Sequence, residues 1–199
     1  MTYQRKDAHY RRARAEGYRA RSVYKLAELD RRYRILRRGD AVVDLGAWPG
    51  GWLQLALERI GHEGRIVGVD LAAIQKLPAP NVALVVGDVR DPATADAVLE
   101  RLGRRADVVL SDLAPKLTGI RASDEARSEE LNQAVLTLLP CLLAPSGRFV
   151  MKTFMGGGFE AVVRATRVHF RETNTTRPDA TRRGSSELYV VGLGFLAQG

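Results

Sequence analysis

The sequence has few cysteines, few histidines and no long apolar run, and each shortage excludes a class of protein. Cys141 is the single cysteine among 199 residues, which excludes an internal disulfide and a metal site built from clustered cysteines. The three histidines, His9, His62 and His169, lack the spacing of metal ligands, and we expect no metal. No run of about 18 uncharged apolar residues occurs, so we expect no membrane-spanning segment. The N-terminus lacks the apolar core of a secretory signal, and a cytoplasmic location is expected.

Acidic residues are also scarce, but only in the first fifth of the chain. Residues 1–38 contain 13 Lys and Arg against 4 Asp and Glu, a net charge of +9, whereas the remaining 161 residues contain 18 against 19, a net charge of −1. The same segment holds five of the six tyrosines. Arginines neutralise phosphates and tyrosines stack on unpaired bases, so this composition favours binding of nucleic acid over a merely solvated surface, without choosing between DNA and RNA.

The basic segment also contains apolar residues, which a disordered tail would not need. Val23, Leu26, Ala27, Ile35 and Leu36 have the spacing of packing positions in a helix and its exit. We therefore expect an ordered appendage to the domain that follows, and not a second domain.

After Gly39 short apolar runs alternate with helical patterns. Such alternation indicates right-handed βαβ units, and therefore an α/β fold with a doubly wound, mostly parallel sheet. Ligands bind such sheets at the carboxyl ends of the strands. Strands are predicted over residues 41–45, 65–70, 82–86, 107–111, 148–152 and 187–193, helices over 52–60, 92–102, 125–143 and 159–169, and a polar stretch over 173–186.

Three successive strand ends carry the features of a nucleoside site. The turn after the first strand holds Gly46, Gly50 and Gly51 in the spacing G-x-x-x-G-G, which differs from the dinucleotide pattern and weakens the case for a NAD-dependent oxidoreductase. Asp70 ends the second strand, where its carboxylate could accept hydrogen bonds from ribose hydroxyls. Asp88 follows the third strand, where it could meet an adenine amino group. The turn is short of cations, which suits a methionine moiety and a sulfonium better than a diphosphate.

Six short motifs follow one another along almost the whole chain. They are residues 21–26 (RSVYKL), 43–52 (VDLGAWPGGW), 87–88 (GD), 111–115 (SDLAP), 150–154 (VMKTF) and 185–189 (SSELY). In this order they resemble the FtsJ/RrmJ family of ribose 2′-O-methyltransferases, which act on large-subunit ribosomal RNA of bacteria. The resemblance implies a Rossmann-like S-adenosylmethionine-dependent methyltransferase fold, whose seven-stranded sheet is mostly parallel, has one antiparallel strand and is covered by helices on both faces.

The resemblance also implies a cofactor and the residues that contact it. The cofactor would be S-adenosyl-L-methionine. Two residues depart from the family pattern, because Trp48 stands where a small residue is usual and Lys116 stands where an asparagine is common. The implied cofactor-binding residues are Gly46, Gly50, Gly51, Trp52, Asp70, Asp88 and Asp112.

The catalytic tetrad of the family maps onto Lys25, Asp112, Lys152 and Glu187. A ribose hydroxyl is a poor nucleophile, so the enzyme must align it for in-line attack and accept its proton. A lysine can act as a base only where its ammonium form is disfavoured. Sequence alone leaves open whether Lys152 removes the proton or steers the oxygen. Each residue also has a structural alternative, such as a phosphate contact for Lys25 or an edge-strand position for Lys152.

These features together predict methyl transfer from S-adenosylmethionine to a ribose 2′-hydroxyl of RNA. We expect the target to be a uridine of 23S ribosomal RNA in the large subunit, and the protein to act as a monomer. Residues 1–38 are predicted to be an RNA-binding segment and residues 39–199 the methyltransferase domain. The alternatives are 2′-O-methylation of transfer RNA or of a messenger RNA cap, and a non-catalytic RNA-binding factor in ribosome assembly.

Overall fold

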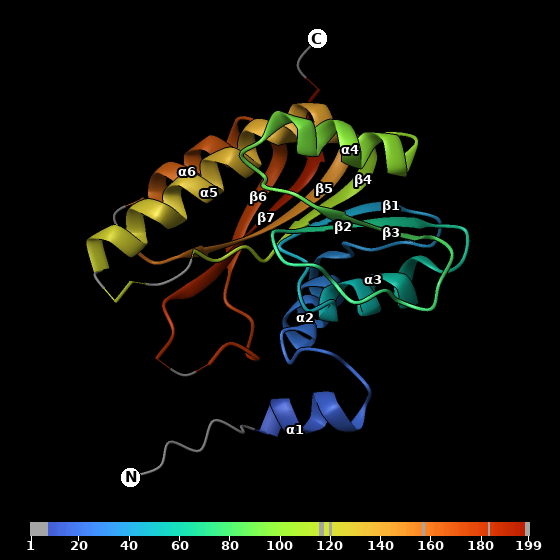
Figure 1. Ribbon diagram of the computed structural model, residues 1–199. Coiled ribbons are helices and arrows are strands. Elements are labelled where there is room, and N and C mark those ends of the chain that lie inside the picture. The colour runs from blue at the N-terminus through green and yellow to red at the C-terminus, as the bar shows by residue number, and fades with distance from the viewer. Residues whose placement is uncertain (1–7, 116–117, 120, 157, 183, 198–199) are drawn as a thin grey trace.

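A computed structural model describes residues 8–115, 118–119, 121–156, 158–182 and 184–197. It contains a seven-stranded sheet in the order β3-β2-β1-β4-β5-β7-β6. Helices cover both faces, with α4, α5 and α6 on one side and α2 and α3 on the other (Figure 1). The strands are β1 (Ala41–Leu45), β2 (Arg65–Asp70), β3 (Val82–Val86), β4 (Ala106–Ser111), β5 (Leu143–Phe154), β6 (Phe170–Thr176) and β7 (Glu187–Phe195). The helices are α1 (Ala8–Ala15), α2 (Val23–Tyr33), α3 (Gly51–Ile60), α4 (Pro92–Leu102), α5 (Arg121–Leu142) and α6 (Phe159–Arg167).

The pairing of the strands confirms the predicted fold class. Strands β1 to β5 pair in parallel, whereas β7 lies antiparallel to both β5 and β6. Among the strands of the described residues, β7 is thus the single one that runs against the others. The order of the first four strands reverses at β1, so the connections that leave β1 and β4 run to helices on opposite faces of the sheet. In sheets of this kind, ligands bind in the crevice at such a switch point.

The sheet contains one strand that the sequence did not predict. β6 covers residues 170–176, part of which was expected to be a polar connecting stretch. It lies at the edge of the sheet and pairs with β7 alone. Of its side chains, that of Phe170 is buried, and the others are half-buried or exposed. An edge strand of this kind needs little apolar sequence, which explains why its pattern resembled a loop.

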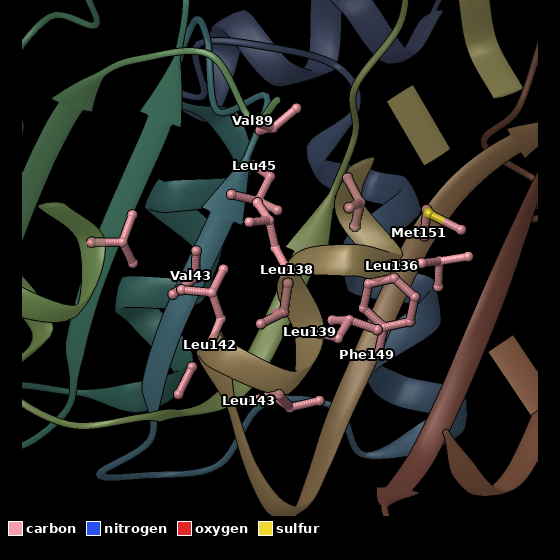
Figure 2. Close-up of a cluster of buried hydrophobic side chains, with 14 of the residues drawn as sticks. Val43, Leu45, Val89, Leu136, Leu138, Leu139, Leu142, Leu143, Phe149 and Met151 are labelled. Carbon is pink, nitrogen blue, oxygen red and sulfur yellow. The ribbon is translucent and has the colours of Figure 1, made fainter. Parts of the chain in front are cut away.

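Two apolar clusters pack on the two faces of the sheet. One lies beneath α4, α5 and α6, where Leu139 packs near Val43 and Phe149 (Figure 2). The other joins the opposite face to α2 and α3 and includes Val42 and Leu53. Val42 and Val43 point to opposite faces and both are fully buried. The continuous apolar run predicted for this strand therefore reflects a central parallel strand that is covered on both sides.

The N-terminal segment is fastened to this framework by buried contacts. Leu26 and Ile35 are fully buried in the cluster shared with α3. Behind them, Arg148 pairs with Asp40 at 2.8 Å and donates to the carbonyl oxygen of Ile35 at 2.6 Å. α2 is thereby held at a fixed place beside the sheet. Across the part of the chain that the structure describes, no helix combines the length and apolar character needed to cross a bilayer.

Candidate active site

The turn between β1 and α3 approaches the end of β4 very closely. Gly46 has a φ of 81°, and a Cβ added there would lie 3.0 Å from the backbone nitrogen of Leu113. Gly50 has a φ of 110° and caps α3. Both positions require glycine, because other residues rarely adopt these angles and Gly46 has no room for a side chain. The turn therefore brings exposed backbone to the crevice at the carboxyl ends of β1 and β4.

Asp70, at the end of β2, holds this turn in place. Its Oδ2 accepts a hydrogen bond from the backbone nitrogen of Trp48 at 2.9 Å, and its Oδ1 accepts one from Ala72 at 2.9 Å. A carboxylate has about four acceptor positions, so Asp70 can still receive the hydroxyls of a ribose. The Trp48 side chain is 60% exposed and lies on the surface of the turn. Lys116, the second departure from the family pattern, lies outside the described residues.

Asp88, after β3, is held by an arginine that sequence reasoning did not single out. Arg90 donates from Nη2 to Oδ2 at 2.6 Å and from Nε to Oδ1 at 3.0 Å. Its Nη1 also reaches Glu130 of α5 at 2.9 Å. The hydrogen bonds from Arg90 lower the pKa of Asp88, so the carboxylate is ionised and can accept a hydrogen bond from an amino group. The sequence signal was a basic residue two positions after the predicted adenine acceptor.

Asp44 is a second group that the sequence analysis left without a role. It lies in β1, is fully buried, and neither carboxyl oxygen has a hydrogen-bond partner among the described residues. Burial raises the pKa of Asp44 well above its ordinary value, and the neighbouring Asp112 and Asp70 add to this effect. A charged residue in the middle of an apolar strand was the available signal. Such a group can be satisfied by a cation placed at the end of β1.

The four residues of the predicted tetrad come together as two ion pairs. Lys25 of α2 pairs with Glu187 of β7 at 2.5 Å. Lys152 of β5 pairs with Oδ1 of Asp112 at 2.9 Å and donates to the carbonyl oxygen of the same residue at 2.6 Å. Both lysines are buried, with 7% and 8% of their surfaces exposed. The site thus contains two buried ammonium groups, each fixed by a carboxylate.

A tyrosine that the sequence analysis gave no role links the two pairs. Tyr189 is fully buried, donates its hydroxyl to Oδ1 of Asp112 at 3.1 Å, and places its ring 5.9 Å from Nζ of Lys25. Burial and the adjacent carboxylates raise the pKa of Tyr189, so its hydroxyl stays protonated as a donor. The signal was its position two residues after Glu187, because alternate residues of a strand share a face.

Strand register and one indole fix this arrangement. Tyr189 is paired directly with Lys152 in the ladder between β5 and β7, so their side chains lie side by side on one face. Trp52 packs its ring against Tyr189 and donates from Nε1 to the carbonyl oxygen of Ser22, next to α2. Its indole is 3% exposed. With the indole buried, the group of Trp52 that remains free to contact a ligand is its backbone N–H in the first turn of α3.

The site therefore has acidic groups along one edge of the sheet and two lysines beside them. Asp44 is the penultimate residue of β1, Asp70 ends β2, and Asp88 and Asp112 follow β3 and β4. Such an edge suits a nucleoside that carries positive charge, which carboxylates attract. The paired lysines lie next to it, where a hydroxyl could be oriented or deprotonated.

Comparisons of the sequence with a family model and with known proteins agree on one family. A family model described as FtsJ-like methyltransferase matches residues 18–195. The chain is 43% identical to the ribosomal RNA large subunit methyltransferase E of Methanothermobacter thermautotrophicus, with 96% of this chain and 90% of that protein covered. It is 42% identical to the protein of the same name from Syntrophobacter fumaroxidans, with 97% and 98% covered.

Solved structures agree with this result. A Plasmodium falciparum chain described as a ribosomal RNA methyltransferase superposes with a TM-score of 0.81 at 26% identity, covering 91% of this chain and 100% of that one. Aeropyrum pernix fibrillarin, with natively bound S-adenosyl-L-methionine, superposes with a TM-score of 0.64 at 17% identity, covering 86% and 76%. The second likeness concerns the fold alone. The predicted resemblance is confirmed, and the chain belongs to the FtsJ-like methyltransferase family.

Proposed function

We propose that this protein transfers a methyl group from S-adenosylmethionine to a ribose 2′-hydroxyl of large-subunit ribosomal RNA, the favoured target being a uridine of 23S RNA. The observation that carries the proposal is the pair of buried lysines, Lys25 and Lys152, each ion-paired with a carboxylate beside the cofactor edge of the sheet. Water-excluded, positioned cations of this kind can orient a hydroxyl that would otherwise react slowly.

The residues at the strand ends fit S-adenosylmethionine. When bound, this cofactor supplies an activated methyl group on a sulfonium. Asp70 would accept hydrogen bonds from the ribose hydroxyls, and Asp88 would accept one from the adenine amino group. The backbone of Gly46, Gly50 and Gly51 lines the turn. The buried, unpartnered Asp44 fits the cationic end of the molecule, because an ammonium would satisfy oxygens that have no partner among the described residues.

The protein's own groups account for the handling of the substrate hydroxyl. Lys152 is held at two points by Asp112, so its ammonium position is fixed before the substrate arrives. As an ammonium it would orient the 2′-oxygen, and it would accept the proton of the hydroxyl only as a neutral amine. Lys25 and Glu187 would hold the ribose from the opposite side, since α2 and β7 meet there. Tyr189 would keep the two ion pairs in register through its hydrogen bond to Asp112.

Two independent observations support RNA as the substrate. The relatives are named ribosomal RNA large subunit methyltransferases, and residues 1–38 have a net charge of +9. Several arginines there serve the fold, because Arg19 donates to the carbonyl oxygen of Gln75 at 2.5 Å and Arg12 pairs with Glu16. Arg11 and Arg14 are exposed, and no ion pair or hydrogen bond engages their side chains within the described residues, so they are suited to phosphates.

The test is to map 2′-O-methyl groups in RNA from cells with and without this protein. Large ribosomal subunits from the deficient cells should accept labelled methyl from S-adenosylmethionine when the purified protein is added, and the label should lie on a ribose. A Lys152→Ala protein is the matched control. Label on transfer RNA or on a messenger RNA cap, or no label on any RNA, would refute the proposed substrate and favour one of the alternatives.

A further inference from the structure

A cavity of about 730 Å³ lies on the opposite side of α2 from the tetrad. It is bounded by α1, by α2 and by the segment that follows β6. α2 contributes Tyr24, Ala27, Glu28, Asp30 and Arg31, and all of these except Asp30 share one face of the helix by their spacing. Lys25 lies on the other face, which packs on the core. One helix thus separates the cavity from the candidate catalytic lysine.

The walls of the cavity are held in place by specific contacts. Glu28 accepts a hydrogen bond from the backbone nitrogen of Asp179 at 2.8 Å, which fastens the segment after β6 to α2. Tyr24 donates its hydroxyl to Glu16 at 2.8 Å, which fastens the end of α1 to the same helix. The cavity is therefore a property of the folded chain, formed where two separate segments meet α2.

Two arginines of this cavity have no acidic partner. Arg31 lies in the last turn of α2 and Arg34 caps this helix with a φ of 55°. Both are exposed, and the structure shows no ion pair or hydrogen bond of their side chains within its described residues. In contrast, Asp30 is already engaged by the backbone of Leu36 at 2.8 Å and by Arg59 at 3.3 Å. Glu28 and Asp179 also line the cavity, so its lining holds four arginines against three carboxylates, a net charge of +1. The cavity is suited to an anion that two guanidinium groups can grip.

Planar groups stand beside these arginines. The rings of His9 and Tyr24 lie 5.5 Å apart, and the guanidinium of Arg12 lies 4.7 Å from the centre of the Tyr24 ring. Imidazole rings, phenol rings and guanidinium planes are the surfaces on which unpaired RNA bases stack. A cavity that combines arginines free of ion pairs with a cluster of planar groups, whose His9 and Tyr24 rings are tilted by 46°, fits a nucleotide better than it fits a simple anion.

We propose that this cavity binds a nucleotide of the substrate RNA that flanks the target ribose. Arg31 and Arg34 would hold its phosphate, and the cluster of His9, Arg12 and Tyr24 would receive its base. This inference rests on the proposed function, because it assumes an RNA substrate. Since α2 carries both the cavity and Lys25, a strand fixed in the cavity is also fixed in register with the tetrad. The cavity therefore helps to choose which ribose is methylated.

The first test compares two double variants with equal loss of charge. Arg31→Ala/Arg34→Ala removes the cavity arginines, and Arg37→Ala/Arg38→Ala removes two exposed arginines that do not line the cavity. Binding of a short fluorescein-labelled single-stranded RNA is measured over a range of salt concentrations. Each phosphate that the protein neutralises contributes about 0.7 to the salt slope for a single strand, so the cavity variant, which loses its hold on one phosphate, should lose about 0.7. The control should lose less than half as much.

A second variant distinguishes the effect of the cavity's shape on RNA binding from the effect of its net charge. Ala27→Leu fills part of the cavity and leaves the net charge unchanged. It should weaken RNA binding and raise KM for ribosomal subunits, while kcat and the affinity for S-adenosylmethionine stay as in the wild type. Equal effects of the two double variants, together with normal RNA binding by Ala27→Leu, would overturn the proposal.

The binding assay does not depend on catalysis. A protein that binds RNA through the cavity but methylates none would refute the proposed function and leave standing only that the cavity binds a nucleotide of RNA. A protein that methylates ribosomal RNA normally with Arg31, Arg34 and Ala27 all replaced would refute this inference alone.

Discussion

Lys152 and Tyr189 are directly opposite each other in the ladder of β5 and β7, and both reach the same oxygen, Oδ1 of Asp112. The ammonium lies 2.9 Å from that oxygen and the hydroxyl 3.1 Å. One carboxylate oxygen therefore positions a lysine on one strand and a tyrosine on the next. Strand pairing, which the chain forms for stability, also sets the geometry of the candidate catalytic group.

The most direct prediction concerns Lys152. Lys152→Ala should bind S-adenosylmethionine and RNA normally but lose about 10²- to 10⁴-fold in single-turnover methylation, because a group that positions or deprotonates the hydroxyl is gone. Lys152→Arg should not restore the rate, since a guanidinium does not accept a proton near neutral pH and has a different shape. Near-normal single-turnover rates in Lys152→Ala would refute the mechanism.

Tyr189→Phe should act through Asp112. The change removes the 3.1 Å hydrogen bond and keeps the ring that packs on Trp52. A lost hydrogen bond of this kind costs about 1 kcal/mol, so we expect about a fivefold decrease in kcat with little change in KM. Tyr18→Phe is the control, because it removes a hydroxyl contact to Glu58 far from the tetrad. An unchanged kcat in Tyr189→Phe would show that Asp112 needs no second partner.

Asp88→Ala should weaken the binding of S-adenosylmethionine, since a carboxylate that accepts a hydrogen bond from the adenine amino group would be lost. The expected cost is about 1–3 kcal/mol, or roughly 5- to 150-fold in Kd by calorimetry. Asp96→Ala is the control, an equal change of charge at an exposed position of α4. Arg90→Ala should have a smaller effect than Asp88→Ala, because Arg90 only orients the acceptor. Wild-type affinity in a folded Asp88→Ala protein would remove Asp88 from the site.

Asp44 should make the stability of the protein depend on pH in an identifiable direction. Burial raises the pKa of Asp44 above its ordinary value of 3.8. Between the ordinary pKa and the raised pKa of the folded state, the folded protein keeps a proton that the unfolded chain has lost. The free energy of unfolding therefore falls as the pH rises through this range. Asp44→Asn should therefore gain stability relative to wild type with rising pH, by at most about 1.4 kcal/mol per pH unit. The gain should level off above the folded pKa.

Urea unfolding over a series of pH values, without cofactor, measures this effect. Asp88→Asn provides the contrast, because hydrogen bonds from Arg90 lower the pKa of Asp88. That carboxylate stabilises the fold above its ordinary pKa and stops doing so as the pH falls, so Asp88→Asn should lose stability relative to wild type as the pH rises. If both variants follow the same trend, the buried Asp44 does not control the pH dependence.

The sequence predicted the strand ends well, because each central strand is a short apolar run that must be buried on both faces. Asp70 ends such a run and Asp88 follows the apolar run of β3, so their placement at the carboxyl ends of neighbouring strands could be anticipated. β6 could not, since an edge strand that pairs with β7 alone tolerates a polar sequence. β3, the other edge strand, was predicted because all five of its residues are apolar.

Side-chain partners were harder to predict than strands. That Arg90 reaches both Asp88 and Glu130 depends on where α5 lies, and spacing along the chain does not record this. Tyr189 reads as an ordinary strand residue until the register with Lys152 is known. The isolation of Asp44 is likewise a property of its surroundings. The residue types of the site were visible in the sequence, but their mutual contacts required the fold.

The ion pair between Lys25 and Glu187 joins residues that are 162 positions apart in the chain. During synthesis, the helix with the first of these residues leaves the translating ribosome long before the strand with the second. A nascent chain therefore carries half of a site until its last strand has emerged. An early release or a truncation before β7 removes Glu187 and Tyr189 together with Val190 and Val191, which are buried in the two apolar clusters. The tetrad and its linking tyrosine therefore become complete together, when β7 has been synthesised and paired.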